Sequence, residues 1–276
     1  MFVILLLGPT ANLIAGHRLD ELNGKERFDA LNAVRQTLVA AAAGFAAAVG
    51  LAFTARTYAL SRRAQEVDRF ARAVSLLSSE RQSERIGGLL TIEYVIRERN
   101  TEARAAVETV CAFIRERSSI TAASYEEVRS AAPQWGRPED SVADDIHTAL
   151  MIIGFNYPRP QRFMLDLSNT DLRGAGLAGS NFSMVKLFGC LMQGASFVGA
   201  DLKYSRLDRS VMVGAWLERT DLRRATLRDV DLRGANLTEA QIDPSQLLPA
   251  IVDDSTVLDE HVRTRLYELK KSQACR

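Results

Sequence analysis

The sequence is poor in the residues that most often build metal, redox or disulfide sites. Three cysteines lie far apart in the chain, at Cys111, Cys190 and Cys275. They form no CxxC pair and no disulfide framework, which suits a reducing compartment for the domains that carry them. Three histidines are equally isolated, at His17, His147 and His261. None stands at metal-ligand spacing from a cysteine or a carboxylate, so we predict no metal site.

An excess of either charge sign is also missing. Lysine and arginine number 35 against 34 aspartates and glutamates, a formal net charge of +1, and charged residues make up 25% of the chain. The total therefore shows neither the basic excess typical of nucleic-acid-binding chains nor a strongly acidic surface. The composition fits a globular or solenoid protein and excludes a disordered one.

Charge is absent altogether from residues 36–55, which read QTLVAAAAGFAAAVGLAFTA. Twenty uncharged residues are long enough to cross a bilayer core of about 30 Å, so we predict a transmembrane helix there. Four small residues stand four apart in it, at Ala40, Gly44, Ala48 and Ala52. Such a stripe lets membrane helices approach closely, but any alanine-rich helix shows one by chance.

Residues 1–16, MFVILLLGPTANLIAG, are uncharged as well, but they are short for a span and are interrupted at Gly8-Pro9. A secretory signal would have a basic residue before its apolar run, and this segment has none. Two interpretations stay open: a first short membrane segment joined to the second by a loop over 17–35, or a single-span protein. A slight excess of arginine after the second span, with the isolated cysteines, predicts a protein of the cell membrane whose large C-terminal part faces the cytoplasm.

Apolar residues recur at helical spacing after the second span, which predicts a small α-helical domain over 57–155. Eleven basic and nine acidic residues over 62–117 indicate a solvated surface rather than a nucleic-acid groove. Residues 118–139, rich in Ser and Ala and with two prolines, are expected to form a linker. Close to the C-terminus, residues 257–273 predict a helix with Asp259 as N-cap that covers or flanks the preceding domain.

A large apolar residue occupies every fifth position from Leu167 to Leu247, seventeen times without an insertion. Five residues advance an α-helix by about 500°, so this spacing defines no buried helical face. In a straight strand the same spacing alternates between the two faces. A chain that bends once per repeat returns each of these residues to the inside. A small residue mostly stands two positions earlier. Such units cannot bury their apolar residue alone, so the pattern predicts a stacked solenoid over 163–247 with capped ends.

These residues resemble the pentapeptide-repeat family, whose pattern is A(D/N)LXX. The resemblance rests on ADL at 200–202, TDL at 170–172 and 220–222, VDL at 230–232 and ANL at 235–237. It implies a right-handed quadrilateral β-helix with four repeats per coil, hence about four coils and a rod on the order of 20 Å long.

The residues that precede the repeat are similar to the N-terminal part of membrane-anchored actinobacterial pentapeptide-repeat proteins. The similarity rests on LNAVRQTL at 31–38, FTARTYALSRR at 53–63, DRFARAVSLL at 68–77 and ERIGGLLTIEYVIRE at 84–98. It assigns no activity to the chain.

Motifs of enzymatic chemistry are missing too. The sequence has no P-loop, no glycine-rich dinucleotide turn and no GxSxG. GAGLAG at 174–179 looks like a phosphate loop in isolation, but its leucine is in phase with the repeat. Asp201 and Asp221 should stack on one face, where paired carboxylates could serve acid–base catalysis. Lys203 and Arg223 on the same face make a charge ladder the better interpretation. We therefore predict no enzymatic activity, no catalytic residue and no cofactor.

Two binding functions remain, and charge separates them. Some pentapeptide-repeat proteins imitate duplex DNA, bind DNA gyrase and protect cells from quinolones, which requires a dense negative surface in place of phosphates. Residues 163–243 hold ten acidic and ten basic residues, and the last coil is basic through Arg223, Arg224, Arg228 and Arg233. We therefore favour a membrane-anchored scaffold that contacts an unidentified protein and keep the gyrase regulator as the alternative. Nucleic-acid binding is not expected, and homo-oligomerisation stays open.

Apolar residues at positions where the repeat normally has polar ones mark a candidate contact surface. With four repeats per coil, residues twenty apart stack, and this places together Phe188, Leu191, Val198, Val211, Val213 and Trp216. Either a partner protein or the protein's own helical domain covers these residues. Both interpretations predict that the middle coils are covered.

Overall fold

A computed structural model describes residues 24–98, 103–130, 142–156 and 164–274. The chain divides into two compact units, Met1–Asp68 and Arg69–Arg276. Its elements follow one another as α2 (Gly24–Leu77), α3 (Gln82–Arg97), α4 (Ala103–Arg117), α5 (Ala122–Ser130), α6 (Asp144–Asn156), β1 (Leu165–Asp166), β2 (Val185–Lys186), the 3-10 helix η3 (Pro244–Leu247) and α7 (Glu260–Ala274).

Helix α2 contains the uncharged segment 36–55. Among the described residues it is the one helix long and apolar enough to cross a membrane, judged by length and composition, and its most apolar stretch has a mean hydropathy of 2.0. The loop expected over 17–35 is wrong from residue 24 onward, because α2 already begins at Gly24. Residues 25–35 contain no glycine or proline and are rich in good helix formers, so nothing in them stops the helix. The first apolar segment, 1–16, lies outside the described residues.

In the second unit, the last turns of α2 pack with α3, α4 and α6 around one apolar core. Gly88 allows the approach of α3 to α2, since a Cβ there would lie 2.7 Å from the Ala73 carbonyl oxygen. A buried ion pair joins α3 to α6, with the Arg85 Nε 2.6 Å from the Asp145 Oδ2. The Nη1 of the same guanidinium donates to the backbone carbonyl oxygens of Ser79 and Glu80, just after α2.

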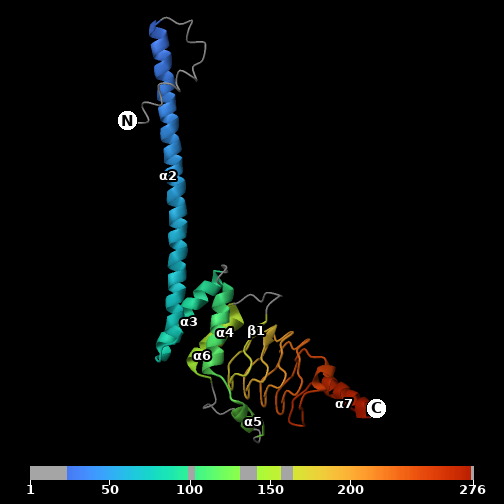
Figure 1. The fold of residues 1–276 in the computed structure, drawn as a ribbon. Coiled ribbons are helices and arrows are strands. Elements are labelled where there is room, and N and C mark those ends of the chain that lie inside the picture. Colours follow the sequence, from blue (N-terminus) through green and yellow to red (C-terminus); the bar gives the residue numbers. More distant parts are fainter. Residues whose placement is uncertain (1–23, 99–102, 131–141, 157–163, 275–276) are drawn as a thin grey trace. The chain divides into compact units, whose positions relative to one another are not determined.

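Residues 165–257 form the solenoid (Figure 1). Parallel bridges join residues twenty apart, except that Asn236 pairs with Val257, twenty-one residues later. Four repeats therefore make one coil. The outward-pointing bridge positions define four faces: face 1 (166, 186, 206, 226), face 2 (171, 191, 211, 231), face 3 (176, 196, 216, 236) and face 4 (181, 201, 221, 241). A one-residue corner with positive φ follows each face and turns the chain onto the next.

Each bend explains the period of five. Backbone φ is positive at fifteen positions spaced five apart from Asn169 to Glu239, and seven of them are glycine. The bend closes with a hydrogen bond such as that from the Ala175 N–H to the Leu172 carbonyl, 3.2 Å, as in a type II turn. Gly174 and Gly179 occupy two of these turns, so the apparent phosphate loop is part of the repeat.

The predicted solenoid core is confirmed. Of the seventeen apolar residues at the fifth positions, sixteen are buried and Ile242 is partly buried. The position two residues earlier also points inward, and it is mostly occupied by small residues that leave room for the large ones; Leu165, Val185 and Val230 are the larger exceptions. Phe182 and Phe197 meet edge to face, with ring centroids 6.4 Å apart.

The helical part caps the first coil. The stretch Ser118–Ile120 adds an antiparallel strand beside Thr170, and the Asp171 N–H donates to the Ser118 carbonyl at 2.7 Å. On face 4 the Asn181 N–H of the first coil donates to the Gly154 carbonyl near the end of α6. These bonds satisfy edge groups that would otherwise invite pairing with another chain.

The last coil is capped from the C-terminal side. Bridges continue to Ile251 and Val257, ten residues beyond the solenoid end expected at 247. Helix α7 buries Val262 and Leu266 in the continuation of the solenoid core. Asp259 stands at the expected N-cap position, immediately before Glu260, and its carbonyl accepts from the Arg263 N–H at 2.9 Å. Its carboxylate accepts from the Glu239 N–H of the last coil at 3.0 Å.

Candidate protein interaction surface

The structure separates the six residues of the candidate contact surface into two groups. Leu191, Val211 and Val213 are buried beneath α5, in a small apolar cluster with Tyr125. Phe188 is partly buried beside them. Val198 and Trp216 lie on face 3, away from this cluster, and the Trp216 side chain is 58% exposed. The group formed by Leu191, Val211 and Val213 is therefore covered by α5 of the same chain and not by a partner.

Helix α5 corrects the linker expected over 118–139. The stretch AASYEEVRS contains neither glycine nor proline, and Tyr125 and Val128 stand three apart, so one face of a short helix meets the solenoid. Two apolar residues in nine give too weak a pattern to identify a helix without its docking site. The remaining linker residues, 131–139, lie outside the described residues.

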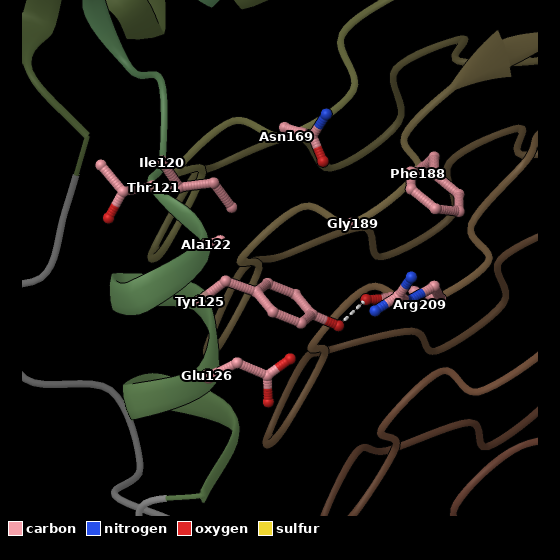
Figure 2. A pocket seen from close by; sticks show the side chains of 9 residues that line it. All are labelled: Ile120, Thr121, Ala122, Tyr125, Glu126, Asn169, Phe188, Gly189 and Arg209. Carbon is pink, nitrogen blue, oxygen red and sulfur yellow. Dashed lines mark hydrogen bonds between the residues drawn. The ribbon is translucent and has the colours of Figure 1, made fainter.

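Tyr125 anchors α5. Its side chain is 8% exposed, and its hydroxyl donates to the Arg209 carbonyl, as Figure 2 shows. The Arg129 Nη1 donates to the same hydroxyl at 3.1 Å, and its guanidinium lies 6.0 Å from the tyrosine ring centroid. One residue therefore combines apolar burial with two polar contacts.

A cavity of about 350 Å³ opens where α5 meets the corner after face 1 (Figure 2). Its lining is mixed apolar and polar, and it consists of Ile120, Thr121, Ala122, Tyr125, Glu126, Asn169, Phe188, Gly189 and Arg209. The described residues place no group of three His, Cys, Asp or Glu side chains where they could hold a metal ion.

Face 3 presents the exposed aromatic side chain. Trp216 stands in the ladder between Ser196 and Asn236, whose short polar side chains leave its ring uncovered. The rim is polar: the Asn236 amide donates to the Glu218 Oε1 at 2.6 Å, and Arg219 pairs with Glu239 at 2.7 Å. An aromatic residue within a polar rim is the usual anatomy of a protein interface.

Face 4 carries the expected charge ladder. The Lys203 Nζ lies 3.2 Å from the Asp201 Oδ2 and 3.5 Å from the Asp221 Oδ2, and Arg223 pairs with Asp221 at 2.7 Å. Burial alone would raise the pKa of Asp221, but hydrogen bonds from Arg223 and the nearby cations lower it overall. A carboxyl group that stays ionised in this way cannot serve as a general acid near neutral pH.

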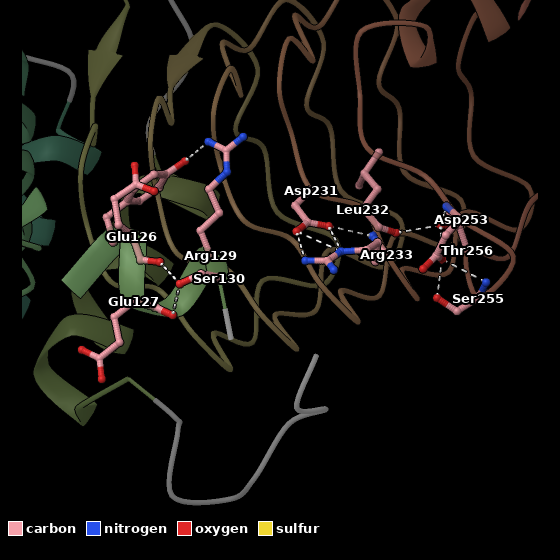
Figure 3. Close-up of polar contacts among 11 residues, drawn as sticks. Glu126, Glu127, Arg129, Ser130, Asp231, Leu232, Arg233, Asp253, Ser255 and Thr256 are labelled. Atoms are coloured by element: carbon pink, nitrogen blue, oxygen red, sulfur yellow. Dashed lines mark hydrogen bonds and ion pairs between the residues drawn. The ribbon is translucent and has the colours of Figure 1, made fainter. Parts of the chain in front are cut away.

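Two further buried polar groups form hydrogen bonds within the solenoid. Asp231, almost fully buried, receives two hydrogen bonds from the Arg233 guanidinium, at 2.6 and 2.9 Å (Figure 3). Cys190 occupies an inward small-residue position and donates to the Leu167 carbonyl. Burial raises the pKa of the Cys190 thiol to about 11, so the nucleophilic thiolate is absent at neutral pH.

Comparison with known proteins bears on the repeat alone. Residues 165–194 and 205–241 match the family model described as pentapeptide repeats, in eight copies. A search of the curated proteins finds no match.

Among the similar solved structures, two are described as pentapeptide repeat proteins and one as a resistance protein. A pentapeptide repeat protein from the cyanobacterium Cyanothece 51142 is 27% identical, with a TM-score of 0.31, over 38% of this chain and 68% of that one. One from the Arabidopsis thaliana thylakoid lumen is 23% identical, with a TM-score of 0.31, over 37% and 70%. QnrB1, a plasmid-mediated fluoroquinolone resistance protein, is 15% identical, with a TM-score of 0.20, over 38% and 65%.

Proposed function

For a chain that carries pentapeptide repeats in a β-helix solenoid, we propose a non-enzymatic scaffold, tethered to the cell membrane, that binds a protein partner through face 3. The observation that carries the proposal is the exposure of Trp216, 58%, on a face whose backbone is fixed by bridges to the coils on both sides. Tryptophan is enriched among the residues that dominate binding energy at interfaces.

The rest of the apolar surface strengthens this choice. Leu191, Val211 and Val213 are already covered by α5, so the fold provides its own cover where several apolar residues gather. Trp216 has no such cover among the described residues. A rigid face loses little conformational entropy on binding, which favours affinity per unit of buried area.

The tether is the segment 36–55 of α2. Its length and lack of charge suit a bilayer core, and the residues on both sides of it are similar to membrane-anchored actinobacterial pentapeptide-repeat proteins. The helical and repeat parts then face the cytoplasm, the compartment that suits the isolated cysteines and the arginine excess after the span.

Charge distinguishes this function from imitation of DNA. The solenoid has equal numbers of acidic and basic residues over 163–243, and six of its cations pair with its own carboxylates. A surface of this kind does not present the uniform negative charge of two phosphate backbones. The alternative, a gyrase regulator, predicts that the purified chain changes the supercoiling activity of gyrase, whereas the scaffold predicts no change.

The test is the size of the complex in source-cell membranes solubilised with mild detergent. The wild-type chain should migrate on a native gel above the size of the chain alone, and Trp216→Ser should release it. Tyr267→Ser is the matched control, because Tyr267 is an aromatic residue of α7 with 70% exposure outside face 3. Equal migration of wild type and Trp216→Ser would refute binding through face 3.

A further inference from the structure

The ten basic residues of the solenoid divide into two groups. Six form ion pairs with solenoid carboxylates at 2.6–3.6 Å: Arg173, Lys186, Lys203, Arg219, Arg223 and Arg233. The other four form no ion pair with any described residue, and all four are exposed: Arg206, Arg209, Arg224 and Arg228. These four, named here the arginine surface, all lie on face 1 or at the corners that bound it.

The backbone holds the arginine surface together. Arg206 is a bridge residue of face 1, between Lys186 and Thr226. Arg209 and Arg224 occupy corners, with φ of 62° and 61°. Coils stack about 4.8 Å apart and residues advance about 3.3 Å along each strand, so the four Cα atoms fall within roughly 15 Å of one another.

Two aromatic rings orient the corner arginines without neutralising them. The Arg224 guanidinium lies 5.7 Å from the ring centroid of Tyr204, one coil earlier. The Arg209 guanidinium lies 5.8 Å from the ring centroid of Phe188, which also belongs to the preceding coil. A cation held over a ring keeps its charge and its donors for a ligand, and its restricted motion lowers the entropy cost of binding.

The acidic residues of this region do not cancel the charge. Residues 204–209 and 224–229 hold four arginines and two aspartates, which leaves +2 on a solenoid that is neutral overall. From α5, Glu126 in the cavity beside Arg209 and Arg129 at Tyr125 add one charge of each sign and leave this excess unchanged. Asp208 is engaged within the fold, since its carboxylate accepts from the Thr226 hydroxyl at 2.6 Å and from the Arg228 N–H at 3.0 Å. Asp229 alone is exposed and has no side-chain partner among the described residues.

We infer that the arginine surface binds an acidic segment of a protein. Guanidinium groups match carboxylates with paired hydrogen bonds, and arginine with tyrosine is the composition favoured at protein interfaces. Nucleic-acid backbones and anionic bilayers offer a continuous field of negative charge and favour a larger basic excess than +2. The exposed Asp229 would repel either of them, whereas a peptide can place a neutral or basic residue there. The inference rests on the proposed function only in that the partner is a protein.

The probe is a fluorescein-labelled peptide of alternating Glu and Gly, titrated by anisotropy with the full chain in a neutral detergent. Arg206→Gln with Arg224→Gln should weaken binding about tenfold, since each exposed pair contributes modestly. Arg219→Gln with Arg223→Gln, which removes the same charge from ion-paired sites on other faces, should leave it unchanged. Binding by the wild type should weaken as salt is added. Unchanged thermal denaturation of both variants keeps the comparison independent of folding.

Three results would overturn the inference: no binding of the peptide, equal binding by the Arg206/Arg224 variant, or tighter binding of oligothymidylate or phosphatidylglycerol vesicles through the same arginines. Trp216→Ser should bind the peptide normally. That variant separates the two proposals, because failure of face 3 as an interface changes complex size but not peptide affinity.

Discussion

Tyr125→Ala tests whether α5 is a separately docked element that covers face 2. The substitution removes a side chain that is 8% exposed, together with its hydrogen bond to Arg209. Burial of a side chain of this size contributes about 1.5–3 kcal/mol, and a net hydrogen bond about 1 kcal/mol. The docked state of α5 should therefore lose about 3 kcal/mol, which raises its open population about a hundredfold.

Amide hydrogen exchange of the full chain measures this opening. Amides of 122–130 should exchange about a hundredfold faster in Tyr125→Ala, while amides of the solenoid coils keep wild-type rates. Tyr125→Phe should produce only the hydrogen-bond part of the effect, and Tyr267→Ala, at an exposed site on α7, should produce none. Faster exchange throughout the solenoid would show that α5 belongs to the main core, and unchanged exchange of 122–130 would show that Tyr125 does not anchor the helix.

Three further predictions concern the solenoid and its helical cap. Gly199→Ala places a Cβ at φ 66° with no neighbour within 4 Å, so the strain of the left-handed conformation alone should cost about 1 kcal/mol in denaturant titration. An unchanged midpoint would contradict the positive φ of that turn. Arg85→Met leaves the buried Asp145 carboxylate with the Arg117 Nε at 3.7 Å as its remaining cation. The free energy of unfolding should therefore fall by about 3 kcal/mol and recover in part when Asp145→Asn is added; an unchanged midpoint would contradict the burial of the pair. Iodoacetamide should leave Cys190 unmodified in the native protein and label it in denaturant. Rapid labelling of the native protein would contradict the burial of this thiol. The pKa of Cys190, about 11, exceeds the unfolded value of about 8.5, so the thiol's contribution to stability is present below pH 8.5 and is lost as the pH rises toward 11.

The sequence identifies the solenoid because its period admits one explanation. A spacing of five fits neither a helix nor a straight strand, so Leu167 and its sixteen successors can share an interior only if the chain bends in every repeat. For the fifteen of them from Leu167 to Leu237, the structure places the bend at the second residue after the apolar one, with positive φ whether that residue is glycine or not. A twenty-residue coil then fixes which outward positions stack.

Contacts made by the outward positions are not determined by that period. Leu191 and Trp216 both break the polar pattern, but only the first is covered, because α5 returns to face 2 from outside the repeat. Two apolar residues within nine do not specify such a helix. The end of the last coil could not be predicted either. Val257 pairs with Asn236, twenty-one positions earlier, and so it breaks the period of five.

The arginine surface could be predicted from the sequence in part. The stacking of Arg224 on Tyr204 follows from their separation of twenty residues and could be inferred from the sequence. The absence of ion pairs from the four arginines, among the described residues, could not be inferred, because ion pairs depend on side-chain conformation as well as position. The sequence shows a neutral solenoid, whereas the structure shows that its positive charge is unevenly paired.

The most direct test of the interface on face 3 is photo-crosslinking in the source-cell membranes, with a photoreactive amino acid in place of Trp216 and mass spectrometry of the adduct. We predict one specific adduct with another protein, and none when the photoreactive residue replaces Tyr267. Crosslinks confined to residues 60–155 of the same chain would contradict the proposal, because they would show that the protein's own helical domain covers Trp216.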